Sequence, residues 1–478
     1  MNGALAIAPI LIPLAAAAVQ VLLGIRFRRF RTGLSFLSCL ALVAVAALLM
    51  MSASRGEGAT LVYSLGNWPA RFAIVLVVDR LSALMLLLTA VLALAVLPYA
   101  LGRWQRMGPH FQPLVQVLLV GYNGAFLTGD LFNLFVFFEV LLAASYGLAL
   151  HGSGARRVGA SLHYIAINLT ASMLFLVGVG LIFGVTGTVN MAVLAHLIPD
   201  LTGTPRALMQ AGAAWLGLAS LIKAAVGPVG FWLPRTYSAA IPPVAALFAA
   251  MTKLGIYVIL RLSLLLFGAD AGPESAHFGS DWLLWLGIIT LVVGSIGMLG
   301  ARELGKLAAY SVLVSSGTLL GAVALHNPAV TAGALAYLVI SVLGIAAFFL
   351  LTGLVVPREA PEGAAQLEPY DPAIDALFAA EDERRVASPA PVVILAVCFF
   401  ACGLLLAGLP PLSGFLAKFA LLAPMLDHGA GATALFALII TAGLCTVIAM
   451  ARAGLQIFWA GADWQFPHVE ARETVSVV

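Results

Sequence analysis

The sequence contains very little charge. Only 9% of its 478 residues are Asp, Glu, Lys or Arg, whereas a soluble globular domain carries about 25%. Hydrophobic residues make up 62% of the chain, which is more apolar surface than a water-soluble fold can bury, so lipid must be the solvent for most of it. The net charge of +3 is spread over short loops and forms no basic patch, which argues against nucleic acid as a partner.

Cysteine is also rare. The four cysteines all lie within apolar runs: Cys39, Cys398, Cys402 and Cys445. Cys398 and Cys402 are four residues apart on one helical face, but no further metal ligand stands near them, so we assign the cysteines to helix packing. No nucleotide-binding loop, metal cluster or redox-cofactor motif is visible in the sequence, which predicts a protein without a cofactor or a metal.

Long apolar runs dominate what is present. A helix needs roughly 20 apolar residues to cross about 30 Å of hydrocarbon, and helices satisfy their own backbone there. The first run, from Leu5 to Leu23, is followed by basic residues instead of being preceded by them, which predicts a retained membrane helix and not a cleaved signal peptide. We therefore expect an all-α polytopic membrane protein with about 13 transmembrane helices. The predicted spans are 3–25, 33–52, 74–101, 113–129, 131–150, 160–185, 207–227, 240–267, 281–301, 304–325, 329–355, 390–426 and 430–460.

Basic residues alternate between successive loops. Short cytoplasmic loops carry an excess of Lys and Arg, and the loop after the eighth span is acidic. Arginines gather in the loops after the first, third, fifth, seventh and ninth spans: Arg26, Arg28, Arg29, Arg31, Arg103, Arg106, Arg156, Arg157, Arg235 and Arg302. The pattern places the N-terminus outside. It also places the segment 357–389, which holds eight acidic residues and scattered proline, in the cytoplasm as a solvated linker.

Four charged residues fall deep within the predicted spans. They are Glu139, Lys223, Lys253 and Lys418. A central Lys or Asp costs about 2.5–3.5 kcal/mol even on the lenient insertion scale, so it persists for a partner or a transport path. One acid and three lysines on four helices favour a path for protons or cations over isolated structural ion pairs. His163, early in the sixth span, has two readings: a packing histidine, which we favour, and a proton relay.

The other charges near the spans favour structural roles. Arg261 and Lys306 are within reach of a membrane surface and are predicted to snorkel. Asp79 and Arg80 mark the start of the third span, and Asp130 lies in the tight turn between the fourth and fifth spans.

Proline and glycine interrupt two spans. The seventh runs into Gly227–Pro234 and the twelfth is interrupted at Gly408–Phe415, so both helices should break there. Each break lies within seven residues of a buried lysine, Lys223 before the first and Lys418 after the second. The breaks are five spans apart, so successive five-helix units would be inverted in the membrane. Paired discontinuous helices in inverted halves point to the ion path of a transporter.

The domain organisation follows from these repeats. We predict an N-terminal three-helix segment over 1–111 and a first inverted repeat, helices 4–8, over 112–267. The second inverted repeat, helices 9–13, covers 281–460 and carries the acidic linker. A C-terminal tail covers 461–478.

Four stretches of the sequence resemble a known family: Leu65–Pro69, Thr128–Glu139, Thr186–Met191 and Gly408–Phe415. The resemblance is to the antiporter-like membrane subunits shared by respiratory complex I and the multisubunit Mrp cation/proton antiporters. Within these, the chain looks most like the D-type subunit of Mrp antiporters. The second and third stretches are specific to the D-type subunit, and the last is shared by the wider family.

The resemblance implies fourteen helices, broken seventh and twelfth helices, and a central polar axis. It also implies a fifth-helix glutamate, which matches Glu139, and a seventh-helix lysine, which matches Lys223. Its eighth- and twelfth-helix lysines match Lys253 and Lys418. The sequence departs from the family pattern in ending at Val478, about where a fourteenth helix should begin.

The residues and the resemblance together predict the proton-translocating subunit of a multisubunit Na⁺(K⁺)/H⁺ antiporter in a bacterial inner membrane, a transporter subunit and not an enzyme. Its partners would be other membrane subunits, the lipid bilayer, H⁺ and either Na⁺ or K⁺. In the predicted mechanism, Glu139 and Lys223 form an ion pair that opens and closes, and the lysine releases its proton when the pair opens. Lys253 receives the proton through water, and Lys418 connects onward to one aqueous side.

Two other functions stay open. One is a proton-pumping subunit of a complex I-type or hydrogenase-type respiratory complex, which shares every feature except the stretches specific to the D-type subunit. The other is a non-transporting scaffold, for which removal of a buried lysine would reduce assembly and not turnover.

Overall fold

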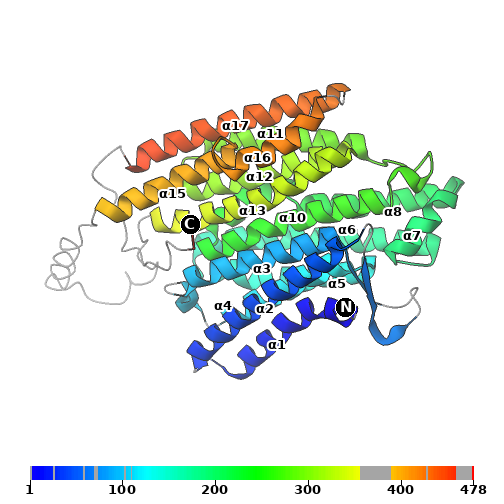
Figure 1. Ribbon diagram of the computed structural model, residues 1–478, viewed down its shortest axis with the longest axis horizontal. Coiled ribbons are helices and arrows are strands. Elements are labelled where there is room, and N and C mark those ends of the chain that lie inside the picture. Colours follow the sequence, from blue (N-terminus) through cyan, green and yellow to red (C-terminus); the bar gives the residue numbers. More distant parts are fainter. Residues whose placement is uncertain are drawn as a thin grey trace.

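Helices make up most of the protein in a computed structural model that describes residues 3–24, 27–56, 60–68, 74–101, 104–108, 110–355, 389–426, 429–458 and 476–477. The long helices run lengthwise beside one another, with the N-terminal helices at one side of the bundle and the C-terminal helices at the other (Figure 1). In this part of the chain, ten helices are long and apolar enough to cross a membrane, and four shorter apolar helices accompany them. The prediction of a mostly helical polytopic membrane protein is confirmed.

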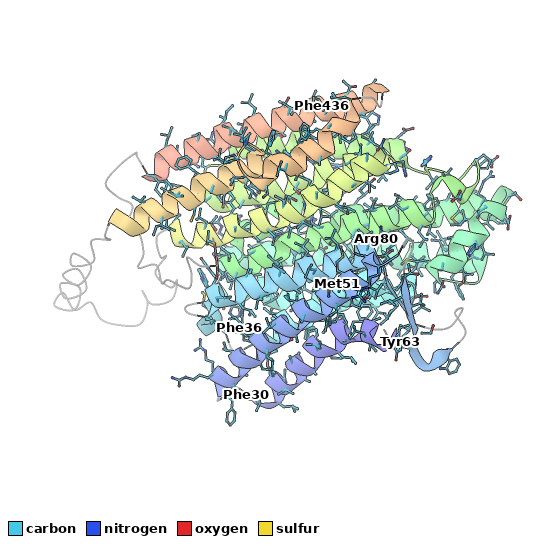
Figure 2. The ribbon with its side chains drawn as sticks, viewed as in Figure 1. Phe30, Phe36, Met51, Tyr63, Arg80 and Phe436 are labelled. Atoms are coloured by element: carbon cyan, nitrogen blue, oxygen red, sulfur yellow. The ribbon has the colours of Figure 1, made fainter. Side chains whose placement is uncertain are left out.

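Three helices form the N-terminal side of the bundle. They are α1 (Ala8–Leu22), α2 (Arg28–Ser54) and α3 (Arg80–Ala100). Large apolar side chains such as Phe30 and Met51 are exposed on α2 (Figure 2), as expected for a surface that faces lipid or another membrane subunit. Arg80 donates from the start of α3 to the carbonyls of Ala53 and Gly56, which ties α3 to the end of α2.

The next group of helices leads to the centre of the bundle. It consists of α4 (Phe111–Leu127), α5 (Leu131–Ala149), α6 (Ala155–Thr186), α7 (Met191–Leu197), α8 (Gly203–Lys223), α9 (Trp232–Ala239) and α10 (Pro242–Leu265). α10 is buried along nearly its whole length, because it packs against α3, α8, α12 and α13. A charge on α10 is therefore as far from lipid as this fold allows.

The C-terminal side contains the remaining long helices. They are α11 (Ser280–Gly300), α12 (Leu304–Ala324), α13 (Pro328–Val355), α15 (Pro389–Ala407), α16 (Ser413–Leu422) and α17 (Gly429–Phe458). Short 3-10 turns join several helices: η1 (Gly3–Ile7), η3 (Leu65–Asn67), η4 (Trp104–Met107), η5 (Ile198–Asp200), η6 (Val229–Phe231), η7 (Ala269–Ala271) and η9 (Ala423–Met425). α12 is enclosed by neighbours much as α10 is.

A small sheet departs from the all-α expectation. β1 (Leu61–Ser64) and β2 (Val75–Val78) pair in antiparallel fashion, with Leu61 opposite Val78. The predicted third span therefore began too early, since 75–78 is strand and α3 starts at Arg80. A short apolar strand directly before an apolar helix shows no periodicity of its own, so the sequence pattern does not separate the strand from the helix. The real signal is Asp79, whose carboxylate accepts from the amide of Ser82 at 2.8 Å and caps α3.

Both predicted helix breaks are present. α8 ends at Lys223 and α9 begins at Trp232, and α15 ends at Ala407 before α16 begins at Ser413. At the first break, the indole of Trp232 donates to the carbonyl of Ile222 at 3.2 Å. Side chains thus replace part of the backbone hydrogen bonding that proline and glycine interrupt.

Two predicted segments lie outside the described residues. They are the acidic linker 357–389, except for Pro389 at the start of α15, and the tail 461–478, except for 476–477.

Candidate functional site

Lys223 is the last residue of α8, directly before the first helix break. Its side chain is only 5% exposed. The ammonium donates to the hydroxyl of Ser172 on α6 at 3.1 Å and lies 4.8 Å from the ring centroid of Phe138 on α5. The C-terminal end of a helix carries partial negative charge, so the break supplies favourable electrostatics for a buried ammonium.

Glu139 follows Phe138 on α5. It acts electrostatically on both Lys223 and Tyr146. Within the described part of the chain, Glu139 and Lys223 are not in ion-pair contact, and the buried Oε1 of Glu139 has no hydrogen-bond partner. The structure therefore has the two charges apart, with Ser172 holding the lysine.

Lys253 lies on α10 and is fully buried. Its ammonium donates to the hydroxyl of Ser316 at 3.0 Å and to the carbonyl of Val312 at 3.4 Å, both on α12. Two residues further along α10, Gly255 packs so tightly against the last turn of α8 that a Cβ there would lie 2.6 Å from the carbonyl oxygen of Ser220. This close approach brings the lysine-bearing segment of α10 against the end of α8.

Lys418 lies on α16, directly after the second break, and is 7% exposed. Its ammonium donates to the carbonyls of Leu406 at 3.1 Å and Ala407 at 2.8 Å, which end α15. The stem crosses Gly408, where φ is +75° and a Cβ would lie 2.3 Å from Cδ of the lysine. Glycine is required there for both its conformation and its lack of a side chain.

A small cavity, lined by both apolar and hydroxyl-bearing residues, lies between the surroundings of Lys253 and those of Lys418. It leaves about 10 Å³ for the centre of a water molecule, which is room for roughly one water. Leu406, whose carbonyl binds Lys418, lines one side. Ser315, which precedes Ser316 in the sequence, also lines the cavity. The hydroxyl of Ser315 donates to the hydroxyl of Ser341 at 3.0 Å. The hydroxyl-bearing residues that line it are Ser311, Ser315, Tyr337, Ser341 and Thr446.

His163 is not brought to the buried lysines. It is exposed on α6, and its Nδ1 lies 3.0 Å from the carbonyl oxygen of Gly159 one turn earlier. Its recorded contact is thus internal to α6, and the relay role stays an untested prediction.

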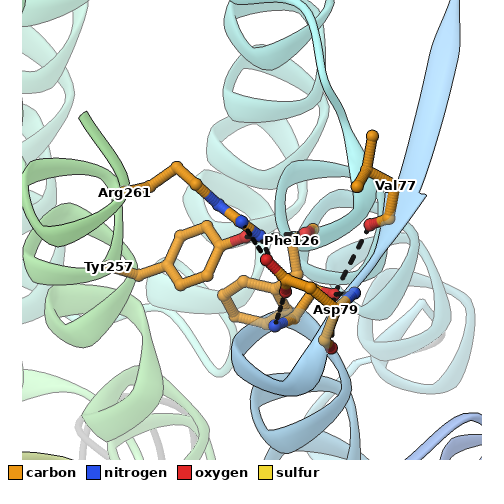
Figure 3. Close-up of polar contacts among 6 residues, drawn as sticks. Val77, Asp79, Phe126, Tyr257 and Arg261 are labelled. Carbon is orange, nitrogen blue, oxygen red and sulfur yellow. Dashed lines mark hydrogen bonds and ion pairs between the residues drawn. The ribbon is translucent and has the colours of Figure 1, made fainter. Parts of the chain in front are cut away.

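Arg261 is not a simple snorkelling residue, which corrects the prediction. Its guanidinium forms an ion pair with both carboxylate oxygens of Asp79, and so joins α10 to the start of α3 (Figure 3). It also donates to the hydroxyl of Tyr257 at 2.8 Å, and that hydroxyl donates to the carbonyl of Phe126 at 2.7 Å. Charge neutralisation by a residue 182 positions away in sequence could not be read from local context.

Glu303 forms a surface cluster that includes Lys306. The carboxylate accepts from Lys306 at 2.7 Å and from Arg156, at the start of α6, at 2.5 Å. The hydrogen bond from Lys306 is the largest effect and lowers the pKa of the Glu303 carboxyl; burial opposes it, and the hydrogen bond from Arg156 adds to the lowering, so the pKa stays below its usual range. The cluster connects α6 to the loop before α12.

Sequence reasoning missed the hydroxyl partners of the lysines. Ser172 and Ser316 carried no charge and no motif, so nothing in isolation marked them. Helical spacing was a usable signal for Ser172, since Asn168 lies four residues earlier on the same helix. Polar side chains at such spacing within an apolar span share one helix face. Ser316 has only apolar residues three and four positions away, so it carried no such signal.

The architecture on which these residues lie is that of secondary transporters and related ion-translocating subunits. Discontinuous helices, each next to a buried ionisable residue, lie within an apolar helical bundle. Residues 128–445 match the family described as "NADH:quinone oxidoreductase/Mrp antiporter, TM".

Individual relatives show to which branch of this family the chain is most similar. The chain is 52% identical over 488 residues to the D-type subunit of a "Probable K(+)/H(+) antiporter" from Rhizobium meliloti (strain 1021), covering 99% of this chain and 90% of that protein. It is 34% identical to the D-type subunit of a "Na(+)/H(+) antiporter" from Bacillus subtilis (strain 168), covering 95% and 86%. A chain of the Mrp complex from Dietzia sp. DQ12-45-1b superposes with a TM-score of 0.80 at 33% identity, covering 96% and 80%. The chain belongs to the antiporter-like membrane subunits and, within them, to the D-type subunits of Mrp antiporters.

Proposed function

We propose that the chain is the proton-translocating subunit of a multisubunit Na⁺(K⁺)/H⁺ antiporter in a bacterial inner membrane, and that it is a transporter subunit and not an enzyme. The observation that carries the proposal is the burial of Lys223, Lys253 and Lys418, each at most 7% exposed, on helices of one apolar bundle. Each ammonium costs several kcal/mol at bilayer depth. A lysine can be charged or neutral, so a role in passing protons would explain why it is retained despite that free-energy cost.

The first step of the proposed path is an exchange of partners at Lys223. Its ammonium is held by Ser172 while Glu139 lies within electrostatic range, with one carboxylate oxygen unpartnered. A small movement of either side chain would exchange the hydroxyl for the carboxylate. The charged lysine is favoured beside Glu139 and disfavoured away from it, so the exchange couples side-chain position to proton release.

The later steps run through Lys253 and Lys418. Among the described residues, a hydroxyl and a carbonyl hold Lys253, so in the neutral state it can accept a proton without first breaking an ion pair to any of them. The cavity beside Ser315 has room for roughly one water, and its lining reaches Leu406, which binds Lys418. We infer that this water carries the proton between the two lysines.

We further propose that 112–267 and 281–460 are inverted repeats and that the N-terminus lies outside. The order of elements supports the repeats: with the short α7 set aside, the fourth helical unit of each region is the broken one, α8–α9 in the first and α15–α16 in the second. The arginine alternation supports the orientation. The 13-helix count belongs to the same proposal.

Other membrane subunits are the proposed partners, and H⁺ and Na⁺ or K⁺ the proposed cargo. The relatives named above carry either K⁺/H⁺ or Na⁺/H⁺ in their names, and one solved relative belongs to an Mrp complex. The exposed apolar side chains on the outer helices are compatible with both lipid and protein neighbours.

The test is cation-dependent proton movement in everted vesicles that contain the whole complex. Glu139→Gln and Lys223→Met should abolish Na⁺- or K⁺-induced proton efflux while the assembled complex is recovered in normal amounts. Lys306→Met is the matched control, because Lys306 is a surface lysine and should retain activity. Full activity of both test variants would refute the proposal, and loss of assembly with unchanged turnover per complex would favour a scaffold.

A further inference from the structure

Two histidines from distant parts of the sequence meet at one end of the bundle. His277 lies in the loop between α10 and α11, and His326 lies in the turn between α12 and α13. Their ring centroids are 4.2 Å apart, with planes inclined at 57°. The pair lies outside the helices that carry the buried lysines, so its role is independent of the proposed proton path.

Both histidines have a positive φ, a backbone conformation that residues other than glycine rarely adopt. His277 has φ of +56° and His326 has φ of +47°. Such a conformation costs an L-residue roughly 1–2 kcal/mol, and glycine or asparagine would adopt it more easily. Strained residues of this kind gather at functional sites, where the surrounding structure holds them in place.

The two histidines differ in their surroundings: a ring nitrogen of His326 lacks a hydrogen-bond partner within the described part of the chain, and His277 faces solvent. The buried Nε2 of His326 has no hydrogen-bond partner among the described residues, whereas the His277 residue is exposed to solvent. A buried polar atom without a partner costs about 1–3 kcal/mol. A ligand that reached Nε2 past His277 would remove this cost.

The ring separation is compatible with a metal ion shared by the two imidazoles. Two imidazoles at right angles around an ion, with metal–nitrogen distances of about 2.0–2.1 Å, place their centroids roughly 4.5 Å apart. The observed 4.2 Å is close to this value. Right-angled nitrogen ligation is the preference of Cu²⁺ and Ni²⁺, and water can occupy the remaining positions.

We propose that His277 and His326 form a binding site for a divalent transition-metal ion of tetragonal preference, Cu²⁺ or Ni²⁺. Among the described residues no third His, Cys, Asp or Glu joins the pair in a metal-binding group, so the proposed site has two protein ligands and water completes the coordination. A bound ion links the loop before α11 to the turn before α13. The arginine alternation places this end of the bundle outside, where the ion would arrive from the external medium.

The experiment uses the purified complex and CuCl₂ as the probe. Equilibrium dialysis and electron paramagnetic resonance should show one nitrogen-ligated Cu²⁺ per complex that is lost in His277→Ala/His326→Ala. The matched control is His196→Ala, which removes another histidine, in the last turn of α7, and should bind Cu²⁺ like the wild type. His326→Gln provides the same comparison if the alanine variant does not assemble, because it preserves a polar side chain of similar length.

Expected affinity at this site is at least tenfold tighter in the wild-type complex than in either single histidine variant. Equal Cu²⁺ binding by the wild-type complex and the double variant would overturn the proposal. So would a wild-type spectrum without nitrogen ligation. Antiport activity of the double variant serves as the check on folding, since neither histidine lies on the proposed proton path.

Discussion

Replacement of Lys253 by methionine separates proton transport from structural support. Lys253→Met keeps most of the side-chain volume and removes only the charge and its hydrogen bonds. The wild-type ammonium donates to Ser316 and to the carbonyl of Val312. Ser316 lies four residues after Val312, so its hydroxyl can donate to that carbonyl once the lysine is gone, and neither group is left unsatisfied.

The energies involved predict a nearly neutral effect on stability. Removal of a central ammonium relieves about 2.5–3.5 kcal/mol on the insertion scale, and the new hydrogen bond from Ser316 to Val312 contributes about 0.5–1.5 kcal/mol. Loss of the two hydrogen bonds from the charged donor costs about 1.5–3 kcal/mol each, or about 3–6 kcal/mol in total. These terms are opposed and of similar size, so the free energy of unfolding should change by no more than about 1–2 kcal/mol. Lys253→Ala would add a cavity cost of roughly 2–5 kcal/mol and is the less informative variant.

The assay is dye-monitored antiport in everted vesicles, normalised to the amount of assembled complex. Lys253→Met should reduce antiport to the level of vesicles without the complex, at a thermal midpoint close to that of the wild type. Lys306→Met controls for the loss of a lysine as such. Undiminished antiport by assembled Lys253→Met complexes would refute the reasoning, because the most deeply buried lysine would then carry no proton.

The same contacts lead to three other predictions. Gly408→Ala should displace Lys418 and slow antiport, because φ is +75° there and the new Cβ would lie 2.3 Å from Cδ of Lys418. Gly300→Ala is the control, since there is open space around Gly300. Equal antiport rates for the two variants would contradict the role of Gly408. Asp79→Asn should lower the free energy of unfolding by about 1–3 kcal/mol, because it leaves the partly buried Arg261 without its ion-pair partner. In a thermal melt, Asp79→Asn/Arg261→Gln should recover part of that loss. A double variant less stable than the single one would argue against the pair. Glu303 has a lowered pKa when folded, so its contribution to stability, below about 1 kcal/mol for so exposed a group, is present above its unfolded pKa and lost as pH falls through its folded pKa. The difference in melting temperature between wild type and Glu303→Gln should therefore hold from pH 7 to about pH 5 and shrink between about pH 4 and pH 3, and a constant difference would exclude this linkage.

The sequence predicted the helical fold well because its signals are local. Apolar length marked the spans, and proline with glycine marked the breaks that precede Trp232 and Ser413. The β1–β2 hairpin was missed, since a four-residue apolar strand next to a helix carries no separate pattern. The short helix α7 was missed as well, because it is too short to span a membrane.

The candidate site could be predicted in part. A charge in an apolar run is visible without a structure, so Glu139, Lys223, Lys253 and Lys418 could all be named from the sequence. Their partners could not, because the hydroxyl that holds Lys253 comes from another helix 63 residues away. The ion pair of Arg261 with Asp79 was missed for the same reason, since pairing between distant helices leaves no local trace.

The central physical claim is that the half-buried Glu139 and the three buried lysines share a hydrated route. A cryo-electron microscopy map of the purified complex, at a resolution that shows ordered water, tests it most directly. The account predicts water density beside the unpartnered oxygen of Glu139 and in the cavity lined by Ser315, Tyr337 and Thr446. Closely packed apolar side chains without water at both places would contradict it.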